Sequence, residues 1–197
     1  MNQHPVTLVF ATHNEHKAEE IQSILPGYIE VKTLQDLGCY DEIPEEKPDF
    51  KGNALQKATY IHEKFGVNCF ADDSGLEIDA LNGEPGIYSA RYAGPKRDSN
   101  DNMDLVLKRM QGKSDRKARF KTIIALIMDG KEYFFEGTID GKIRDQKSGN
   151  NGFGYDPIFE PESCGKTFAE MSLEEKNSMS HRSRAIQKMA KFFIDQV

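Results

Sequence analysis

Near its N-terminus the chain carries a short apolar strand that runs directly into an amphipathic helix, and this order constrains the fold most. The segment 6–11 reads VTLVFA, which predicts a buried strand. From Asn14 onward the apolar residues follow a helical period until Pro26-Gly27 ends the helix. A strand, a polar turn and a helix in this order are typical of α/β proteins.

Later segments continue the alternation. We expect strands at 29–33, 67–71 and 76–80 and helices at 54–65 and 99–110. The Asp-Asp-Ser-Gly segment at 72–75 is good turn chemistry and is expected to interrupt the strand.

The C-terminal half predicts a hairpin and a closing helix. Asp129-Gly130 separates two strand-like runs and is a favoured two-residue hairpin turn, because both of its positions adopt positive φ. Ser172 and Glu175 form a capping-box pattern ahead of an amphipathic helix that reaches 193. Early strand-helix alternation followed by a hairpin predicts an α/β protein with a mixed sheet.

Composition excludes several classes of protein. The 197 residues are 38% hydrophobic and 29% charged, without repeats or linkers, which predicts one globular domain over 1–197. With 26 Lys+Arg against 32 Asp+Glu the net charge is −6, which disfavours a nucleic-acid polymer as partner. No apolar run approaches the roughly 20 residues of a membrane span, and the first residues lack a secretory signal, so we expect a cytoplasmic protein. Three scattered cysteines favour neither disulfides nor a zinc site.

The turn between the first strand and helix is a candidate anion site. Backbone N–H groups at a helix N-terminus attract phosphate, and a lysine in the first turn adds positive charge. The alternative is that Asn14 only caps the helix. The candidate residues are Thr12, His13, Asn14, Glu15, His16 and Lys17.

Carboxylates suggest a magnesium site. Mg²⁺ is satisfied by one or two carboxylates together with water and phosphate oxygens. The alternatives are an ordinary turn at 72–75 and a solvated acidic loop. The candidates are Glu42, Glu45, Glu46, Asp72 and Asp73. Asn53 and Lys57, spaced i and i+4, share a helix face and could meet the same ligand or form a surface pair.

Two C-terminal segments could bind a nucleobase. The segment 149–157 places Phe153, Gly154, Tyr155 and Asp156 in a glycine-rich loop, where an aromatic ring can stack on a base and a carboxylate can accept hydrogen bonds. Lys176, His181 and Arg182 supply hydrogen-bond donors in fixed directions. The alternatives are a structural loop and a helix cap.

Taken in order, these motifs resemble the inosine triphosphate pyrophosphatase family, which removes non-standard purine nucleoside triphosphates. The resemblance covers roughly residues 6 to 195. The matching segments are TxNxxK at 12–17, GNAxxKA at 52–58, ADDSGLEIDALNGEPGIYSARYAG at 71–94, FGYDPIF at 153–159 and KNxxSHR at 176–182. In two places the chain departs from the family's pattern: His13 stands where the family usually has Gly, and Gly52 stands where Glu is common.

The resemblance implies Mg²⁺-dependent hydrolysis of XTP, ITP and dITP to the monophosphate and pyrophosphate. It also implies a homodimer with a central mixed, twisted sheet flanked by helices, and two lobes with the active-site cleft between them.

Residue roles follow by matching position to position. The triphosphate is expected on the turn at 12–17 with Lys17, Lys57 and Ser74. Asp73 and Glu45 are expected to hold the metal, with Asp72 as an auxiliary ligand, and Asp73 to help activate water. Phe153 is expected to stack on the purine while Asp156, Lys176, His181 and Arg182 surround its edges.

Other functions stay open at this point. A related pyrophosphatase of modified pyrimidine nucleotides shares the general architecture, although the FGYDPIF and SHR segments speak against it. An aspartyl-phosphate phosphatase would need an early DxD that the 12–17 turn lacks. A non-catalytic nucleotide-binding module would not need Glu45, Asp72 and Asp73.

Overall fold

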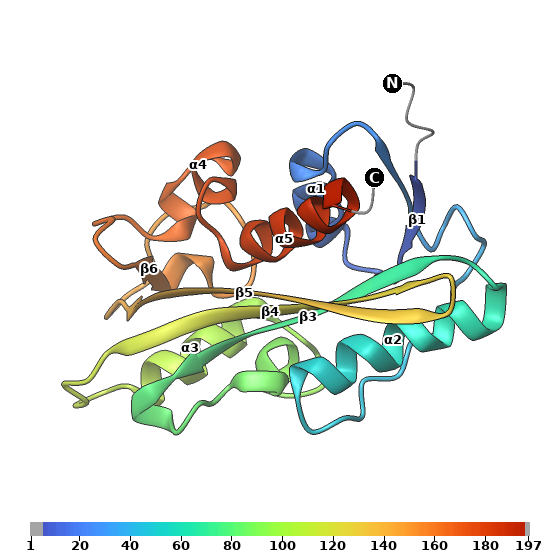
Figure 1. Ribbon diagram of the computed structural model, residues 1–197. Helices are drawn as coiled ribbons and strands as arrows, with labels where there is room; N and C mark the ends of the chain where they lie inside the picture. The colour runs from blue at the N-terminus through green and yellow to red at the C-terminus, as the bar shows by residue number, and fades with distance from the viewer. Residues whose placement is uncertain (1–5, 196–197) are drawn as a thin grey trace. The chain divides into compact units, whose positions relative to one another are not determined.

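The computed structural model describes residues 6–195 (Figure 1). Its strands are β1 (Val6–Phe10), β2 (Ile29–Lys32), β3 (Cys69–Ile78), β4 (Lys117–Met128), β5 (Lys131–Ile143) and β6 (Phe159–Pro161). Its α-helices are α1 (Glu15–Ile24), α2 (Phe50–Phe65), α3 (Ser99–Arg109), α4 (Leu173–Asn177) and α5 (His181–Asp195). Residues 1–5, part of the segment considered above for a secretory signal, lie outside this range. No helix within the described range is long and apolar enough to cross a membrane.

The six strands form one mixed sheet in the order β2-β1-β3-β4-β5-β6. Strand β1 is parallel to β2 and to β3, whereas β5 and β6 are antiparallel. The turn between β4 and β5 has Asp129 at φ 51° and Gly130 at φ 74°, the positive values that this hairpin type requires. The expected mixed α/β sheet is therefore confirmed.

The strand β3 corrects one expectation. The Asp-Asp-Ser-Gly segment does not interrupt it, and β3 runs without a break from Cys69 to Ile78. Turn-forming residues stay extended here because the strand is buried and each carboxylate finds a polar partner in the fold. Local turn preference is thus overridden by tertiary contacts.

Helix ends follow the sequence signals in most places. The side chains of Asn14 and Asp49 cap α1 and α2, and Gly66 ends α2 in the left-handed conformation. The capping box of Ser172 and Glu175 forms as expected, but it begins the five-residue α4 instead of the closing helix. The closing helix α5 starts separately at His181.

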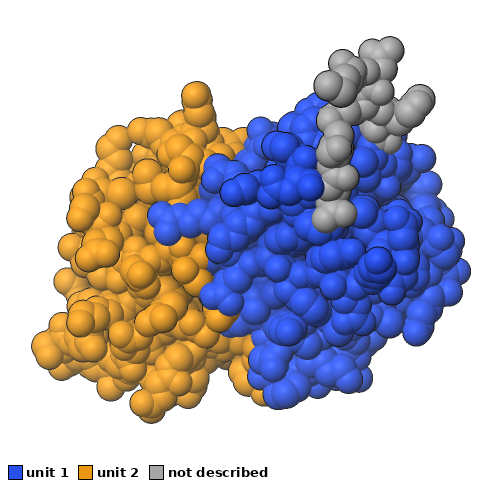
Figure 2. Space-filling view, in the orientation of Figure 1, with its two compact units in different colours: residues 1–73, 122–137, 182–197 blue, residues 74–121, 138–181 orange. Residues whose placement is uncertain are grey.

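The chain divides into two compact units (Figure 2). Unit 1 comprises 1–73, 122–137 and 182–197, and unit 2 comprises 74–121 and 138–181. Within unit 1, one apolar cluster joins strand residues to α1 and α5, and a second joins them to α2, so the strands have helices on both faces. Within unit 2, a core that includes Leu76, Val106, Phe120 and Phe168 joins β3 and β4 to α3. One domain over 1–197 stays a prediction.

Gly141 provides a test of the β5–β6 packing in unit 2. A Cβ at this position would lie 2.3 Å from the backbone oxygen of Glu160 and 2.7 Å from the ring of Phe159. We expect Gly141→Ala to lower the free energy of unfolding by about 2–4 kcal/mol, measured by urea denaturation. Gly27→Ala is the matched control, since a Cβ there meets nothing within 4 Å. Equal stabilities of the two variants would contradict this packing.

Candidate active site

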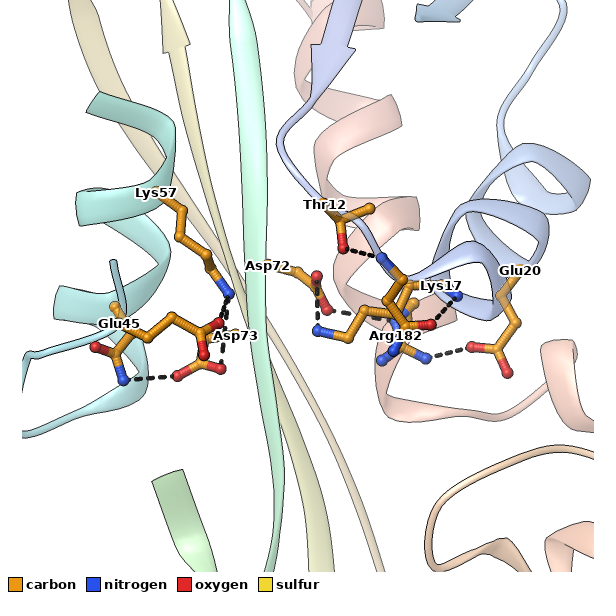
Figure 3. A network of polar contacts seen from close by, with 10 residues as sticks. Thr12, Lys17, Glu20, Glu45, Lys57, Asp72, Asp73 and Arg182 are labelled. Carbon is orange, nitrogen blue, oxygen red and sulfur yellow. Dashed lines mark hydrogen bonds and ion pairs between the residues drawn. The ribbon is translucent and has the colours of Figure 1, made fainter. Parts of the chain in front are cut away.

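The centre of the polar network in unit 1 is the pair of adjacent carboxylates in β3. Successive side chains of a strand point to opposite faces, so Asp72 and Asp73 face opposite ways. Figure 3 shows Lys57 and Glu45 on the side of Asp73, and Lys17 and Arg182 on the side of Asp72. Both carboxylates are buried, with exposed fractions of 1% for Asp72 and 7% for Asp73. One strand therefore presents two separate charged groups.

The first group gathers around Lys57 of α2. Its ammonium is paired with Glu45 and lies 3.9 Å from Oδ1 of Asp73. Asn53, one turn earlier on the same helix face, donates from Nδ2 to Oδ2 of Asp73 at 3.1 Å. The structure thus brings Asn53, Lys57, Glu45 and Asp73 together, and the roles expected for them stay predictions.

Burial and charge set the protonation of this group. Burial raises the pKa of Asp73 to about 6, and the nearby ammonium groups of Lys57 and Lys17 offset only part of that effect. Burial also acts to lower the pKa of Lys57, but the carboxylates of Asp73 and Glu45 outweigh it and hold that pKa above its ordinary value. A permanently charged lysine thus lies beside a carboxyl group that titrates near neutrality.

The second group joins the turn after β1 to Asp72. Asn14 caps α1 by accepting from the backbone N–H of Lys17, and Thr12 Oγ1 accepts from the backbone N–H of Asn14 at 3.1 Å. The ammonium of Lys17 is 3.0 Å from Oδ1 of Asp72. Burial lowers the pKa of Lys17 and outweighs the attraction of Asp72.

Arg182 lies in this second group, in unit 1. Its guanidinium is paired with Glu20 of α1 and lies 3.4 Å from Oδ2 of Asp72, and its side chain is 2% exposed. The structure thus places Arg182 against two carboxylates of unit 1. A buried guanidinium requires such partners, because an unpaired buried charge is strongly destabilising.

The remaining residues expected at the base edges lie in unit 2. Lys176 donates from Nζ to Oδ2 of Asp156 at 2.7 Å, and the same oxygen accepts from the backbone N–H of Phe153 at 2.8 Å. The Lys176 ammonium lies 4.8 Å from the centre of the Phe153 ring. The ring of His181 stacks on Phe120 at 4.7 Å. Phe153 is only half-buried, so an aromatic face and a held ammonium meet near the surface of this unit.

The other candidate residues lie outside these contacts. Glu15 and His16 are exposed on the first turn of α1. Tyr155 is buried and donates its hydroxyl to the backbone oxygen of Ser89 at 2.7 Å. Ser74 is half-buried in β3, and Gly154 follows Phe153 with φ 61°.

Glu45 and Asp73 are a suitable pair for a magnesium ion. They supply hard oxygen donors, and their side chains are 25% and 10% exposed, which leaves room for water and phosphate oxygens as further ligands. Asp72 faces the other side of β3 and does not join them. No three His, Cys, Asp or Glu side chains within 6–195 form a metal-binding group.

Several residues of these groups carried no recognised sequence signal. Glu20 is a buried carboxylate three residues after Lys17 and next to Ile21, the other buried residue of α1. Phe120 follows the alternation of buried residues in β4, which predicts burial but not a stacked histidine. The sequence feature that could have identified Glu20 is a charged residue next to the apolar face of α1.

The pKa of Asp73 predicts how stability changes with pH. The folded protein binds this proton more tightly than the unfolded chain, so the carboxyl lowers stability as the pH rises from 3.8 to about 6. We expect Asp73→Asn to raise the free energy of unfolding at pH about 7.5 by about 1–3 kcal/mol, and the gain to shrink toward pH about 4.

Chemical denaturation at several pH values measures this difference. Asp145→Asn, at a side chain 95% exposed, is the control and should change little at any pH. A constant difference for Asp73→Asn across the range would contradict the raised pKa.

Comparison with known proteins agrees with the motifs and the fold. The model of the Ham1 family matches residues 8–192. The dITP/XTP pyrophosphatase of Flavobacterium johnsoniae is 52% identical over 182 residues, which cover 92% of this chain and 95% of that protein. That of Porphyromonas gingivalis is 46% identical over 188 residues, covering 95% and 97%.

Solved structures show the same similarity. The Ham1 protein of Staphylococcus aureus superimposes with a TM-score of 0.88 at 38% identity, over 97% of this chain and 100% of that one. The Ham1 protein of Coxiella burnetii gives a TM-score of 0.89 at 34% identity, over 96% and 99%. Because the family model matches residues 8–192 and the relatives have such identity and coverage, the chain belongs to the Ham1 family.

Proposed function

We propose that this chain hydrolyses the non-standard purine nucleotides dITP, XTP and ITP to the monophosphate and pyrophosphate, with Mg²⁺. The observation that carries the proposal is the convergence of Glu45 and Asp73 on Lys57. Paired carboxylates beside a lysine suit phosphoryl transfer, which depends on positioning and neutralisation of charge. The substrate class is supported by Ham1-family relatives that carry the name dITP/XTP pyrophosphatase.

The triphosphate binds the positive groups of unit 1 in this proposal. The N-terminus of α1 offers backbone N–H groups and the positive end of the helix dipole. Lys17 and Lys57 add two ammonium groups that their carboxylate partners hold in place. Ser74 can add a hydroxyl donor from β3.

Glu45 and Asp73 hold the magnesium ion, and Asp73 accepts the proton of the attacking water. When bound, the ion neutralises charge on the phosphate oxygens. As water attacks the α-phosphorus, the bond between the α-phosphorus and the bridging oxygen breaks, and pyrophosphate leaves with that oxygen. Lys17 and Lys57 stabilise the negative charge that gathers on the leaving group.

The base is read in unit 2. Phe153 stacks on the purine, and the ammonium of Lys176, oriented by Asp156, donates to the 6-oxo group together with His181. ATP carries an amino group at that position and leaves the donors unpaired, which can reduce turnover by up to ~10⁴. Arg182 is assigned to holding Asp72, because its guanidinium is paired with Glu20 and Asp72.

The proposed function is tested by a panel of nucleotides. Pyrophosphate release is measured from ITP, XTP, dITP, ATP, GTP and dTTP, with and without Mg²⁺. We expect rapid, metal-dependent release from the first three, and a loss of at least about 10²-fold in kcat for Asp73→Asn. Asp145→Asn, at an exposed carboxylate, is the matched control. Orthophosphate as the first product, or activity confined to dTTP, would refute the proposal.

Phe153 tests the assignment of the base. Loss of base stacking costs about 1–3 kcal/mol, so Phe153→Ala should raise KM for ITP by about 5- to 150-fold. The value of kcat should change much less, because stacking contributes equally to the ground state and the transition state. Leu173→Ala, at an exposed apolar residue of unit 2, is the control. An unchanged KM would place the base elsewhere.

A homodimer, expected from the family resemblance, and a cytoplasmic location, expected from the sequence, complete the proposal. Sedimentation of the purified protein tests the dimer.

A further inference from the structure

The acidic segment 41–47, here called the Glu45 loop, lies along one face of α2. The loop runs antiparallel to the helix, so earlier loop residues contact later helix residues. The backbone N–H of Lys47 donates to Asn53 Oδ1 at 2.8 Å, and that of Glu46 donates to Gln56 Oε1 at 3.0 Å. Glu45 itself pairs with Lys57. The helix residues involved lie at positions i, i+3 and i+4, so they share a face of α2.

Asp41 fixes the far end of the loop. Its carboxylate accepts from the hydroxyl of Tyr60 and from the ammonium of Lys64, one and two turns beyond Lys57 on α2. These hydrogen bonds hold the pKa of Asp41 below its ordinary value, so the carboxylate is ionised at neutral pH. The backbone oxygen of Asp41 lies 2.8 Å from Nε2 of His13, in the turn after β1. Asp41 thus ties the loop to two other elements.

At the Lys47 end of the Glu45 loop, Gly52 allows the loop to approach α2 closely. A Cβ on Gly52 would lie 2.7 Å from Cβ of Lys47, closer than side chains tolerate. His13 and Gly52 thus lie at opposite ends of the Glu45 loop, His13 beside Asp41 and Gly52 beside Lys47.

We propose that Asp41, held by Tyr60, Lys64 and His13, is a positioning residue that clamps the Glu45 loop against α2 and so orients Glu45 toward the metal. The Lys47–Gly52 contact closes the other end of this clamp. The inference rests on the proposed function for the role of Glu45, but the clamp itself consists of contacts within unit 1. Loosening either end should release the loop without removing a metal ligand.

Hydrogen exchange tests the clamp without any substrate. Asp41→Ala and Gly52→Ala should each speed the exchange of the Glu46 and Lys47 amides by about tenfold, since these amides depend on the loop lying against α2. Tyr40→Phe is the control: it alters a side chain that is 78% exposed beside the loop. Exchange at the wild-type rate in both variants would overturn the proposal.

Metal dependence tests the positioning role. In Asp41→Ala and Gly52→Ala, the Mg²⁺ concentration for half-maximal pyrophosphate release should rise about three- to tenfold, while kcat at saturating Mg²⁺ stays within about twofold. Gly52→Ala helps to separate a loss of positioning from a loss of stability, because alanine has a higher helix propensity than glycine, by up to about 1 kcal/mol. Tyr60→Phe, which removes one hydrogen bond to Asp41, should change the Mg²⁺ dependence in the same direction by a smaller factor.

Two results separate this proposal from the proposed function. Faster exchange with an unchanged Mg²⁺ dependence would show that the clamp does not position Glu45, and would overturn the inference. If the wild type releases no pyrophosphate, the proposed function fails. Mn²⁺ binding to the nucleotide-free variants, measured by calorimetry, then decides the inference: weaker binding than in wild type supports it, and equal binding overturns it.

Discussion

The polar chemistry of unit 1 depends on two adjacent carboxylates in the buried strand β3. Because a strand turns successive side chains to opposite faces, Asp72 and Asp73 take different nearest partners. Asp72 pairs with Lys17 and Arg182, whereas Asp73 accepts a hydrogen bond from Asn53 and lies 3.9 Å from Lys57. The strand stays extended through a turn-like sequence because these contacts satisfy its charges.

The two groups differ in how completely their charges are matched. The Arg182 side is fully enclosed, with a guanidinium paired to Glu20 and Asp72, which suits a structural support. The Lys57 side is less enclosed: Glu45 is 25% exposed, and burial raises the pKa of Asp73 to about 6. The proposed metal ligands and general base belong to this second, less enclosed group.

The Glu45 loop has no secondary structure, yet its contacts with α2 give it a defined place. Regular spacing on the helix lets a non-helical segment find partners at successive turns. His13 and Gly52 both belong to this arrangement. His13 contacts the backbone oxygen of Asp41, and the absence of a side chain on Gly52 leaves room for Lys47. A loop residue is thus oriented by a rigid helix, an arrangement common in binding sites.

Local signals were enough to predict much of the fold. The period of apolar residues predicted β1, α1 and α2, and Asp129-Gly130 predicted the hairpin, because these features depend on neighbours in sequence. The candidate site was predicted in part: Lys57, Glu45 and Asp73 do meet. The continuous β3 and the separate start of α5 were missed, since distant contacts decide them.

The pattern of residues along the chain was sufficient to predict the mixed α/β architecture, the family resemblance and the residue types available for phosphate, metal and base. Which charges pair depends on how distant segments pack together. The tertiary structure placed Arg182 with Glu20 and Asp72 although His181, the preceding residue, stacks on Phe120. It also joined Asp41 to His13. The physical reason is that a buried charge takes the partner that the packed fold brings to it, and spacing along the chain does not specify that partner.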